Sequence, residues 1–504
     1  MPFIRNTPKA KKAAMGSSAK PLHFVLFPHL APGHLLPLFD TARLLAQRGA
    51  TVTIFTSPGN ASRFESLVSR AVSSGYSIQF VQVQIPFKEA GLPEGCENFD
   101  MLQSYDLAFK LYTAIRFMHK PAEILFEALP LKPSCIISDV CVPWTLQIAR
   151  KHNIPRITFH IFSTFFLLSS YKFGMSQVTQ NTFTETEHVA MSEIPDQNDP
   201  ITEIQTQAQL SQKLMHYSIQ MMAADIKSYG AIVNSSEAVE PESIEEYKKL
   251  RNGKAWCVGP VWLCNKNELD KAERGNKSSI DEHYCLEWLN LQEENSVVYA
   301  CLGSVANLSA SQLIELGLGL EASKRPFVWV IRGGDNLKEL EKWIKEDGFE
   351  ERIKGKGLLI RGWAPQVLIL SHSAIGGFIT HCGWGSILEA ITCGVPIITW
   401  PLFADQFCNQ INVAQVLKIG VKVGAEDLVN NGEGEKIEAL VKKEDIKRAI
   451  EELMDEGEES EERRRRVREM GEMAKKAAEE GGSSHLDLTS LIEDIKQQST
   501  STQE

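Results

Sequence analysis

The sequence predicts an α/β protein made of two Rossmann-like halves, whose parallel sheets face each other across a cleft. Short β-rich apolar runs alternate with helical patterns in the first half of the chain, and the same rhythm starts again after about residue 290. The runs are apolar throughout instead of alternating with polar residues, as expected for strands that are covered on both faces. A chain of 504 residues, of which 43% are hydrophobic, is also long enough for two cores.

The expected strands form two series of five. The first series is "LHFVLFP" (22–28), "ATVTIFTSP" (50–58), "IQFVQVQIP" (78–86), "CIISDV" (135–140) and "PRITFH" (155–160). The second series is "SVVYACLGS", "FVWVIR", "GLLIRGW", "GGFITHCG" and "VPIITWP", between residues 296 and 401. Ligands of open α/β sheets bind at the carboxyl ends of the strands. We therefore expect the functional residues directly after these runs.

The two series divide the chain into domains. We expect a flexible tail at 1–20, a first Rossmann-like domain at 21–260, a linker loop at 261–285, a second Rossmann-like domain at 286–480, and a C-terminal helix at 481–504 that packs back on the first domain. Residues 265–281 of the linker are polar and lack apolar periodicity, which predicts an exposed loop. The interleaved acids and bases of residues 451–470 are more typical of solvated helices than of an interaction tail.

Charge and cysteine content limit the partners and the compartment. A formal net charge of −11 argues against a nucleic-acid partner, because no surplus of Lys and Arg exists to neutralise phosphates. The ten cysteines show neither C-x-x-C pairs nor zinc-like spacing, which favours a reducing compartment. We expect a cytoplasmic monomer with small-molecule partners and no integral membrane segment, because no secretory signal and no run of about 18 apolar residues occurs. The basic tail also fits a transit peptide, but a solvated tail has the same composition.

His34 and Asp139 form a candidate acid–base pair. His34 follows the first strand at the expected start of a helix, where the helix dipole disfavours the imidazolium form and keeps a neutral base available. Asp139 ends the run "CIISD" in the same sheet, and a carboxylate bonded to one ring nitrogen would stabilise the protonated imidazole. Two other interpretations remain open: His34, like His29, only caps or packs, and Asp139 is the N-cap of the next helix.

The densest cluster of polar and aromatic residues lies between Trp363 and Gln406. Trp363 offers a flat face for a nucleobase, and Gln366 offers an amide for sugar hydroxyls or a base edge. After the strand "GGFIT", the turn from His381 to Ser386 opens a helix whose free N–H groups form a natural diphosphate site.

Three acidic or amide residues extend this candidate site. Glu389, one turn into the helix, could accept hydrogen bonds from ribose hydroxyls. Asp405 and Gln406 follow the last strand, at a helix start, where they suit sugar hydroxyls; Asp405 could also be a simple helix cap. By contrast, "GLGLEA" (317–322) matches a dinucleotide motif but follows Ser309 and Gln312, which predict a capping box and a position inside a helix.

These motifs together resemble the signature of plant family 1 UDP-dependent glycosyltransferases, which have the GT-B fold. W-x-P-Q, H-C-G-W-x-S, E, G-V-P, W-P and D-Q all stand in place between residues 363 and 406. The resemblance extends to G-H-x-x-P (33–37), Asp139, "NSSEAVEP" (234–241), "VGP" (258–260) and "CLGS" (301–304). It is strongest to the branch that glucosylates flavonoids, triterpenoids, steroids and other phenolic or alicyclic acceptors.

The resemblance implies a role for each candidate residue. The first domain would bind the acceptor, with His34 as general base and Asp139 as its partner, and the second would bind the UDP-sugar. Gln at position 406 is associated with glucose donors. The implied donor contacts are Trp363 and Ala364 with uracil, Gln366 and Glu389 with ribose, Ser304, His381 and Ser386 with the diphosphate, and Trp384, Asp405 and Gln406 with the sugar.

Gly385 departs from the family, which usually has Asn between Trp and Ser. The Asn side chain normally reaches the phosphate or sugar region, and a hydrogen bond to a charged group is worth roughly 1.5–3 kcal/mol. Its absence would weaken UDP-sugar binding by roughly ten- to a hundredfold unless a neighbour replaces it.

The expected reaction is an inverting single displacement with UDP-glucose as co-substrate. His34 would take the proton of the acceptor hydroxyl, and the helix start at Ser386 would meet the charge of the departing UDP, so no metal or other cofactor is expected. No D-x-D motif of metal-dependent transferases occurs in the chain. The alternatives are a UDP-sugar-binding protein without transfer activity, suggested by Gly385, and a Rossmann oxidoreductase, disfavoured by the misplaced glycine motif.

Overall fold

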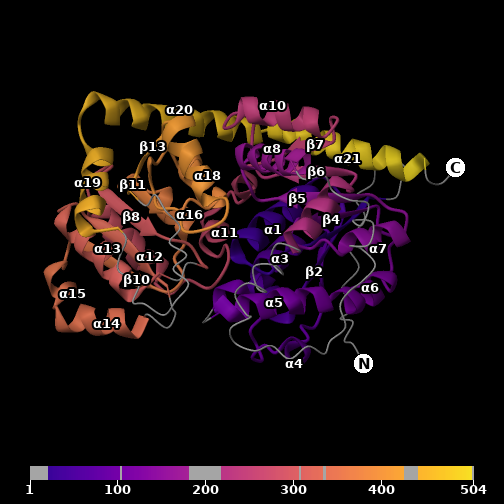
Figure 1. The fold of residues 1–504 in the computed structure, drawn as a ribbon, viewed down its shortest axis with the longest axis horizontal. Helices are drawn as coiled ribbons and strands as arrows, with labels where there is room; N and C mark the ends of the chain where they lie inside the picture. Colours follow the sequence, from indigo (N-terminus) through magenta and orange to yellow (C-terminus); the bar gives the residue numbers. More distant parts are fainter. Residues whose placement is uncertain are drawn as a thin grey trace.

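The computed structural model of the protein describes residues 21–102, 105–180, 217–305, 308–332, 337–424 and 441–501. Two parallel sheets form the centres of two domains, which Figure 1 shows side by side. The predicted fold class of two Rossmann-like domains is confirmed. The expected tail at 1–20 lies outside the described residues.

The sheet of the first domain has seven strands in the order β3-β2-β1-β4-β5-β6-β7, and all neighbours are parallel. Phe24 and Leu26 of β1 belong to one apolar core, and Val25 and Phe27 belong to the core on the opposite face. Both faces are covered, which explains why the strands are apolar throughout. The strands are β1 (His23–Phe27), β2 (Thr51–Thr56), β3 (Ile78–Gln82), β4 (Cys135–Asp139), β5 (Arg156–His160), β6 (Gly230–Val233) and β7 (Ala255–Cys257).

The sheet of the second domain has six parallel strands in the order β10-β9-β8-β11-β12-β13. The chain order reverses beside β8, as it reverses beside β1 in the first sheet, and ligands of such sheets bind at this switch point. The strands are β8 (Val297–Cys301), β9 (Phe327–Ile331), β10 (Gly357–Arg361), β11 (Ile375–Thr380), β12 (Ile397–Thr399) and β13 (Gly420–Lys422).

Helices connect the strands of both sheets. In the first domain they are α1 (Pro32–Gln47), α2 (Pro58–Arg63), α3 (Glu65–Ser73), α4 (Phe87–Ala90), α5 (Tyr105–Phe117), α6 (His119–Glu127), α7 (Thr145–Lys151), α8 (Thr164–Gln180), a helix over 217–226, and α10 (Pro241–Leu250). From the linker onward they are α11 (Glu268–Ala272), α12 (Glu282–Asn290), α13 (Ala310–Ala322), α14 (Leu337–Glu346), α15 (Phe349–Arg352), α16 (Gln366–Leu370), α17 (Trp384–Cys393), α18 (Gln406–Ile411), α19 (Lys443–Met454), α20 (Glu458–Ala478) and α21 (Ser483–Ser501). Short 3-10 turns lie at Phe99–Met101 and Val261–Cys264, and a π turn lies at Asn412–Val416.

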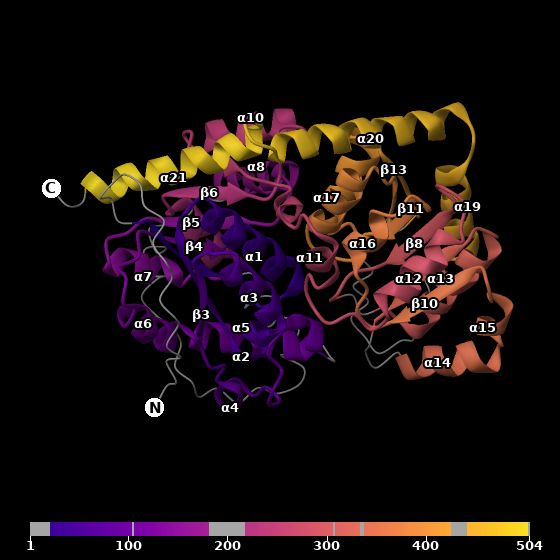
Figure 2. The same cartoon turned by 180° about the vertical axis from the view of Figure 1, so that it is seen from behind.

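The last two helices cross from the second domain to the first. In Figures 1 and 2, α20 runs along the second domain and α21 continues along the first. Leu488, Leu491 and Ile495 of α21 are buried in the core that contains Phe24. The Asp487 carboxylate accepts a hydrogen bond from the backbone N–H of Cys257 at 2.7 Å. The end of the chain is thereby fastened to the edge strand β7.

Each of the ten expected runs contains a strand, whereas β6, β7 and β13 were not predicted. These three strands have only three or four residues each. β12 is equally short, but the apolar run "VPIITWP" that contains it is longer than the strand itself. The conformation of β6, β7 and β13 is set by their neighbours in the sheet.

The expectation of an exposed linker loop at 265–281 is only partly right: residues 266–269, 277, 279 and 281 are exposed, but the rest of the segment is not. The segment contains α11, and Asn265 and Asp270 are only 3% and 1% exposed. Arg43 and Arg70 of the first domain bind the Asp270 carboxylate at 2.7 Å and 2.9 Å. The sequence pattern of a polar segment indicates solvent exposure when its charged partners are some 200 residues away in the chain, because a local pattern does not include them.

Two further expectations concern the charged and capped helices. The charged run 451–470 lies within α19 and α20, with ion pairs along the helix such as Arg465 with Glu469 at 2.6 Å. "GLGLEA" lies inside α13, whose N-cap Ser309 accepts the N–H of Gln312 at 3.2 Å. The second half of the predicted capping box is wrong, because the Gln312 amide bonds to the backbone of Val441 instead. Among the described residues, no helix is both long and apolar enough to cross a membrane.

Candidate active site

His34 and Asp139 form a hydrogen-bonded pair at the carboxyl ends of β1 and β4. His34 is the third residue of α1, whose N-cap Ala31 provides no side-chain cap. Asp139 is the last residue of β4 and is fully buried. Its Oδ2 lies 2.8 Å from Nδ1 of His34, whose side chain is 16% exposed. The histidine thus keeps its second ring nitrogen, Nε2, for another partner.

The Asp139 carboxylate is stabilised in its charged form. Burial alone would raise its pKa, but the neighbouring His34 and the N–H of Cys141, 2.8 Å from Oδ1, lower the pKa below its ordinary value. The alternative role of Asp139 as the N-cap of the following helix is not observed, because α7 has Trp144 at its N-cap. The carboxylate is therefore available to steady a protonated His34.

A second histidine, His29, lies beside this pair. Its ring centroid is 4.8 Å from that of His34, and the side chain is 2% exposed. Burial, and then the charge of His34, lowers the pKa of His29 to about 3. A neutral His29 adds no positive charge beside the base.

The His34, Asp139 and Cys141 side chains offer the one cluster among the described residues that could be considered for a metal ion. Burial raises the pKa of the Cys141 thiol well above its ordinary value. A thiol that keeps its proton is a poor metal ligand. The cluster therefore fits an acid–base pair better than a metal site.

Aromatic side chains surround His34 on the side of the first domain. Phe162 is the second residue after the end of β5, and its ring centroid is 6.3 Å from that of His34. The ring centroid of Phe166 of α8 is 5.2 Å from that of Phe162. Tyr112 of α5 stacks on His29 at 5.4 Å. These residues come from two segments of the first domain, α5 and the stretch from the end of β5 into α8. Such half-buried rings suit a flat apolar ligand.

Three of the predicted donor-binding residues contact each other in the second domain. Nε2 of Gln366 lies 3.0 Å from Oγ of Ser386 and 2.7 Å from Oε2 of Glu389. Ser386 belongs to the first turn of α17, which has Gly383 at its N-cap and no side-chain cap. The unpaired N–H groups and the helix dipole at this position favour an anion.

The His381 imidazole is enclosed between two glycines. A Cβ at Gly303 would lie 2.7 Å from the ring, and a Cβ at Gly383 would lie 2.5 Å from its Nε2. Burial lowers the pKa of His381 to about 4. The ring is therefore neutral near pH 7 and can donate one N–H to an anion without carrying charge. Ser304, the next residue after Gly303, lies on the same loop after β8.

Trp363 lies where the linker contacts the second domain. The guanidinium of Arg332 lies 5.0 Å from its ring centroid. The linker passes the indole so closely that a Cβ at Gly275 would lie 2.4 Å from it. Ser279 exchanges two hydrogen bonds of 2.8 Å with the Trp363 backbone. Ala364, the next residue, is buried.

The Trp384 side chain does not border a sugar site, contrary to the expectation. The indole is 2% exposed, and its Nε1 donates to the carbonyl of Asn234 at 3.0 Å. It belongs to the core of the second domain, where a large apolar ring is most stable. Trp384 is nevertheless the first residue of α17, so its backbone belongs to the helix start predicted to bind the diphosphate.

Asp405 and Gln406 lie at the start of α18 and make local hydrogen bonds. Oδ2 of Asp405 accepts from Asn409 at 2.7 Å, and Asn409 also contacts the Cys382 carbonyl and Ser163 of the first domain. Burial raises the pKa of Asp405 to about 6, and the charge of His34 partly opposes this shift. Oε1 of Gln406 accepts the N–H groups of Leu402 and Phe403, 2.8 Å and 3.1 Å away. Asn409 therefore connects the Asp405 carboxyl to Ser163 of the first domain.

Gly385 has open space around its Cα. A Cβ built there would meet no atom within 4 Å, and the residue is the second of α17. The missing side chain is therefore not excluded by packing.

Four residues that sequence reasoning did not single out belong to this region. Arg274 bonds to Glu389, Gly275 contacts Trp363, Arg332 lies over the same indole, and Asn409 holds Asp405. Arg274 and Gly275 stand in the polar run "ERGNKS", where nothing in the local pattern points to a buried contact. Only the folded chain brings them to the site.

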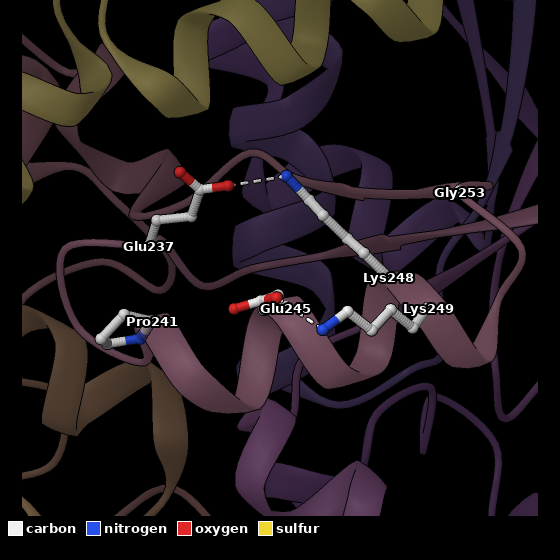
Figure 3. Close-up of a pocket in the computed structure, with 6 residues that line it drawn as sticks. All are labelled: Glu237, Pro241, Glu245, Lys248, Lys249 and Gly253. Carbon is white, nitrogen blue, oxygen red and sulfur yellow. Dashed lines mark hydrogen bonds and ion pairs between the residues drawn. The ribbon is translucent and has the colours of Figure 1, made fainter.

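A separate hollow lies over α10, away from these residues (Figure 3). It has a volume of about 500 Å³ and is lined by Glu237, Pro241, Glu245, Lys248, Lys249 and Gly253. Lys248 pairs with Glu237 at 2.8 Å, and Lys249 pairs with Glu245 at 2.5 Å. Because its charges neutralise each other and none of the predicted site residues lines it, the hollow is not the candidate site.

Comparisons with known proteins show what the chain is similar to. A family model described as UDP-glucoronosyl and UDP-glucosyl transferase matches residues 275–456. UDP-glycosyltransferase 73C11 from Barbarea vulgaris is 52% identical to the chain, over 95% of this chain and 97% of that protein. The structure of Glycyrrhiza uralensis UGT73P12 complexed with glycyrrhetinic acid 3-O-monoglucuronide is similar with a TM-score of 0.78 and 33% identity, over 96% and 98% of the two chains. Arabidopsis thaliana UGT89C1 complexed with UDP-L-rhamnose is similar with a TM-score of 0.72 and 28% identity, over 95% and 100%.

Proposed function

The chain belongs to the family of plant UDP-dependent glycosyltransferases, and we propose that it transfers glucose from UDP-glucose, with inversion, to a hydroxyl of a small apolar or phenolic plant metabolite. One observation carries the proposal. The hydrogen-bonded pair of His34 and Asp139 lies beside the second domain, because Phe162, whose ring centroid is 6.3 Å from that of His34, precedes Ser163, whose hydroxyl binds Asn409 at 2.8 Å. Asn409 in turn binds the Asp405 carboxylate and the Cys382 carbonyl, directly before α17. A base and an anion site therefore adjoin at the domain boundary.

His34 acts as the general base of the proposed reaction. Its Nδ1 is bonded to Asp139, which leaves Nε2 to take the proton of the acceptor hydroxyl. The hydroxyl oxygen attacks the anomeric carbon of the sugar from the face opposite UDP, and the bond to the UDP oxygen breaks. The buried Asp139 carboxylate stabilises the imidazolium that forms. The neutral His29 next to it does not compete for the proton.

The departing UDP is stabilised by the second domain. Its negative charge lies against the uncapped start of α17, with the Ser386 hydroxyl and an N–H of His381 as further donors. We propose that this arrangement replaces the metal ion that other transferases use. Uracil stacks on Trp363 beside Ala364, and the ribose hydroxyls bind Glu389 and Gln366.

Separate residues support the choice of sugar and the choice of acceptor. Glucose is supported by Gln406, which the family associates with glucose donors, although one related structure holds UDP-L-rhamnose and another a glucuronide. A triterpenoid or flavonoid acceptor is supported by the aromatic rings of Phe162, Phe166 and Tyr112 near the base. A cytoplasmic location is supported by ten cysteines that form no disulfide.

Replacement of His34 by alanine tests the function. Purified wild-type protein with UDP-glucose and a mixture of phenolic and triterpenoid acceptors should release UDP and form glucosides that mass spectrometry detects. His34→Ala should lower kcat by about a hundredfold or more. It should leave UDP binding unchanged, because His34 contacts the acceptor and not UDP in the proposed reaction. Wild-type turnover by this variant would remove His34 from the mechanism. UDP release without glucoside would indicate donor hydrolysis instead.

A further inference from the structure

We propose that Arg274 of the linker is a positioning residue for the donor, which fixes the Glu389 carboxylate and ties the donor-binding helix α17 to the base-bearing helix α1. The inference rests on the proposed function, in which Glu389 binds the ribose. It assigns a role in the reaction to a segment that its composition predicts to be an exposed loop.

The guanidinium of Arg274 bridges one carboxylate from each domain. Nε and Nη2 lie 2.9 Å and 2.8 Å from Oδ2 of Asp40, and Nη1 is ion-paired with Oε1 of Glu389. The three side chains are 8–9% exposed. A planar guanidinium can make such a two-sided contact, whereas a lysine ammonium cannot match both carboxylates.

The two carboxylates belong to the helices that carry the chemistry. Asp40 lies on α1, six residues after His34, and Glu389 lies on α17, three residues after Ser386. Both stretches lie within single helices, so Arg274 joins the base and the diphosphate site through two short segments of chain. A change at Arg274 should therefore alter both donor binding and the alignment of base and sugar.

Glu389 is fully oriented before a donor binds. Its Oε1 is held by Arg274, and its Oε2 accepts from Gln366 at 2.7 Å. A carboxylate has about four lone-pair positions, so it can still accept hydrogen bonds from two ribose hydroxyls. Without the guanidinium, the two buried carboxylates would lose their cationic partner next to the site of a diphosphate, although Asp40 would keep its hydrogen bond from Asn265 at 2.8 Å. Their repulsion would turn Glu389 away from its present orientation.

A purely structural role is already served by another contact. Arg43 on α1 binds Asp270 of the same linker at 2.7 Å and touches no predicted donor-binding residue. Arg43→Gln is therefore a matched control, because it removes a linker ion pair of the same kind without affecting Glu389.

Calorimetric titration of the full chain with two nucleotides tests the inference. Wild type, Arg274→Gln, Arg274→Lys and Arg43→Gln are titrated with UDP and with 2′,3′-dideoxy-UDP, which lacks both ribose hydroxyls. Arg274→Gln and Arg274→Lys should bind UDP about tenfold more weakly than wild type, and bind the dideoxy nucleotide with nearly wild-type affinity. Arg43→Gln should bind both nucleotides as wild type does. Steady-state rates should show a lower kcat and a higher KM for UDP-glucose in the Arg274 variants, with the acceptor KM unchanged.

The possible outcomes distinguish a failure of the role proposed for Arg274 from a failure of the proposed transferase function. If wild type binds no UDP, the proposed function fails and the inference fails with it. Suppose that wild type binds UDP more tightly than the dideoxy nucleotide. If the Arg274 variants then lose no affinity for UDP, or lose the same affinity for UDP and for the dideoxy nucleotide, only the inference about Arg274 is overturned. If Arg274→Gln does not fold, Arg274→Lys, which keeps the positive charge, decides the question alone.

Discussion

Replacement of Gly385 by asparagine measures what the departure from the family signature costs this protein. Gly385 is the second residue of α17, and an added Cβ meets no atom within 4 Å. The substitution therefore introduces an amide at the predicted diphosphate site without displacing a neighbour.

The magnitude follows from two separate contributions. A hydrogen bond from the amide to a charged phosphate is worth roughly 1.5–3 kcal/mol, which corresponds to a donor KM about ten- to a hundredfold lower. Asparagine also replaces a glycine in a helix, which stabilises the fold by only a few tenths of a kcal/mol, since both residues are poor helix formers.

The assay varies UDP-glucose at saturating acceptor for wild type, Gly385→Asn and Gly385→Ala. Alanine fills the same Cβ position and stabilises the helix by roughly 0.5–1 kcal/mol, but it offers no hydrogen bond. We expect the donor KM to fall in the asparagine variant alone, and the midpoint of thermal unfolding to rise in the alanine variant. An unchanged donor KM in Gly385→Asn would refute the reasoning and show that the helix start and Ser386 already meet the phosphate charge.

Two further predictions concern the sugar site and the linker. Because burial raises the pKa of Asp405 to about 6, its carboxylate is charged above that pH and neutral below it, so the KM for UDP-glucose should rise as the pH falls from 7 to 5; Asp405→Asn should abolish this dependence. The folded protein also binds this proton more tightly than the unfolded chain, in which the carboxyl has the ordinary pKa of 3.8, so the charged Asp405 destabilises the fold above pH 6. Asp405→Asn should therefore unfold at a higher temperature than wild type at pH 7, which calorimetry can check. Gly275→Ala should lower the free energy of unfolding by roughly 1–3 kcal/mol and weaken UDP binding, because a Cβ there meets the Trp363 indole at 2.4 Å and the backbone has a φ of +107°. Wild-type stability and UDP affinity in this variant would show that the linker does not press on the indole.

Local sequence patterns were sufficient for the fold class and for most of the strands. Continuous apolar runs identify strands covered on both faces, and each predicted run contains one. The same patterns did not identify β6, β7 and β13, which are defined by their pairing with neighbouring strands of the sheet. The positions of His34 and Asp139 at strand ends were also readable, and their 2.8 Å contact follows from β1 and β4 being neighbours.

The orientation of side chains around the site could not be read from the sequence. Trp384 stands in the most recognisable motif of the chain, yet its indole turns into the core and bonds to Asn234, 150 residues away. Which face of a helix is buried depends on what packs against it, and a short motif carries no information about that partner.

The sequence by itself determined the chemistry: two parallel-sheet domains, a histidine with a carboxylate partner, and a helix start suited to a diphosphate. These features depend on residues that are close in the chain or on neighbouring strands. Only the tertiary structure decided the role of the linker. Arg274 is buried between Asp40 and Glu389, which lie more than 100 positions from it in opposite directions. A charged side chain looks solvated until the partners that neutralise it are in place, because burial is favourable for a charge only when it is paired.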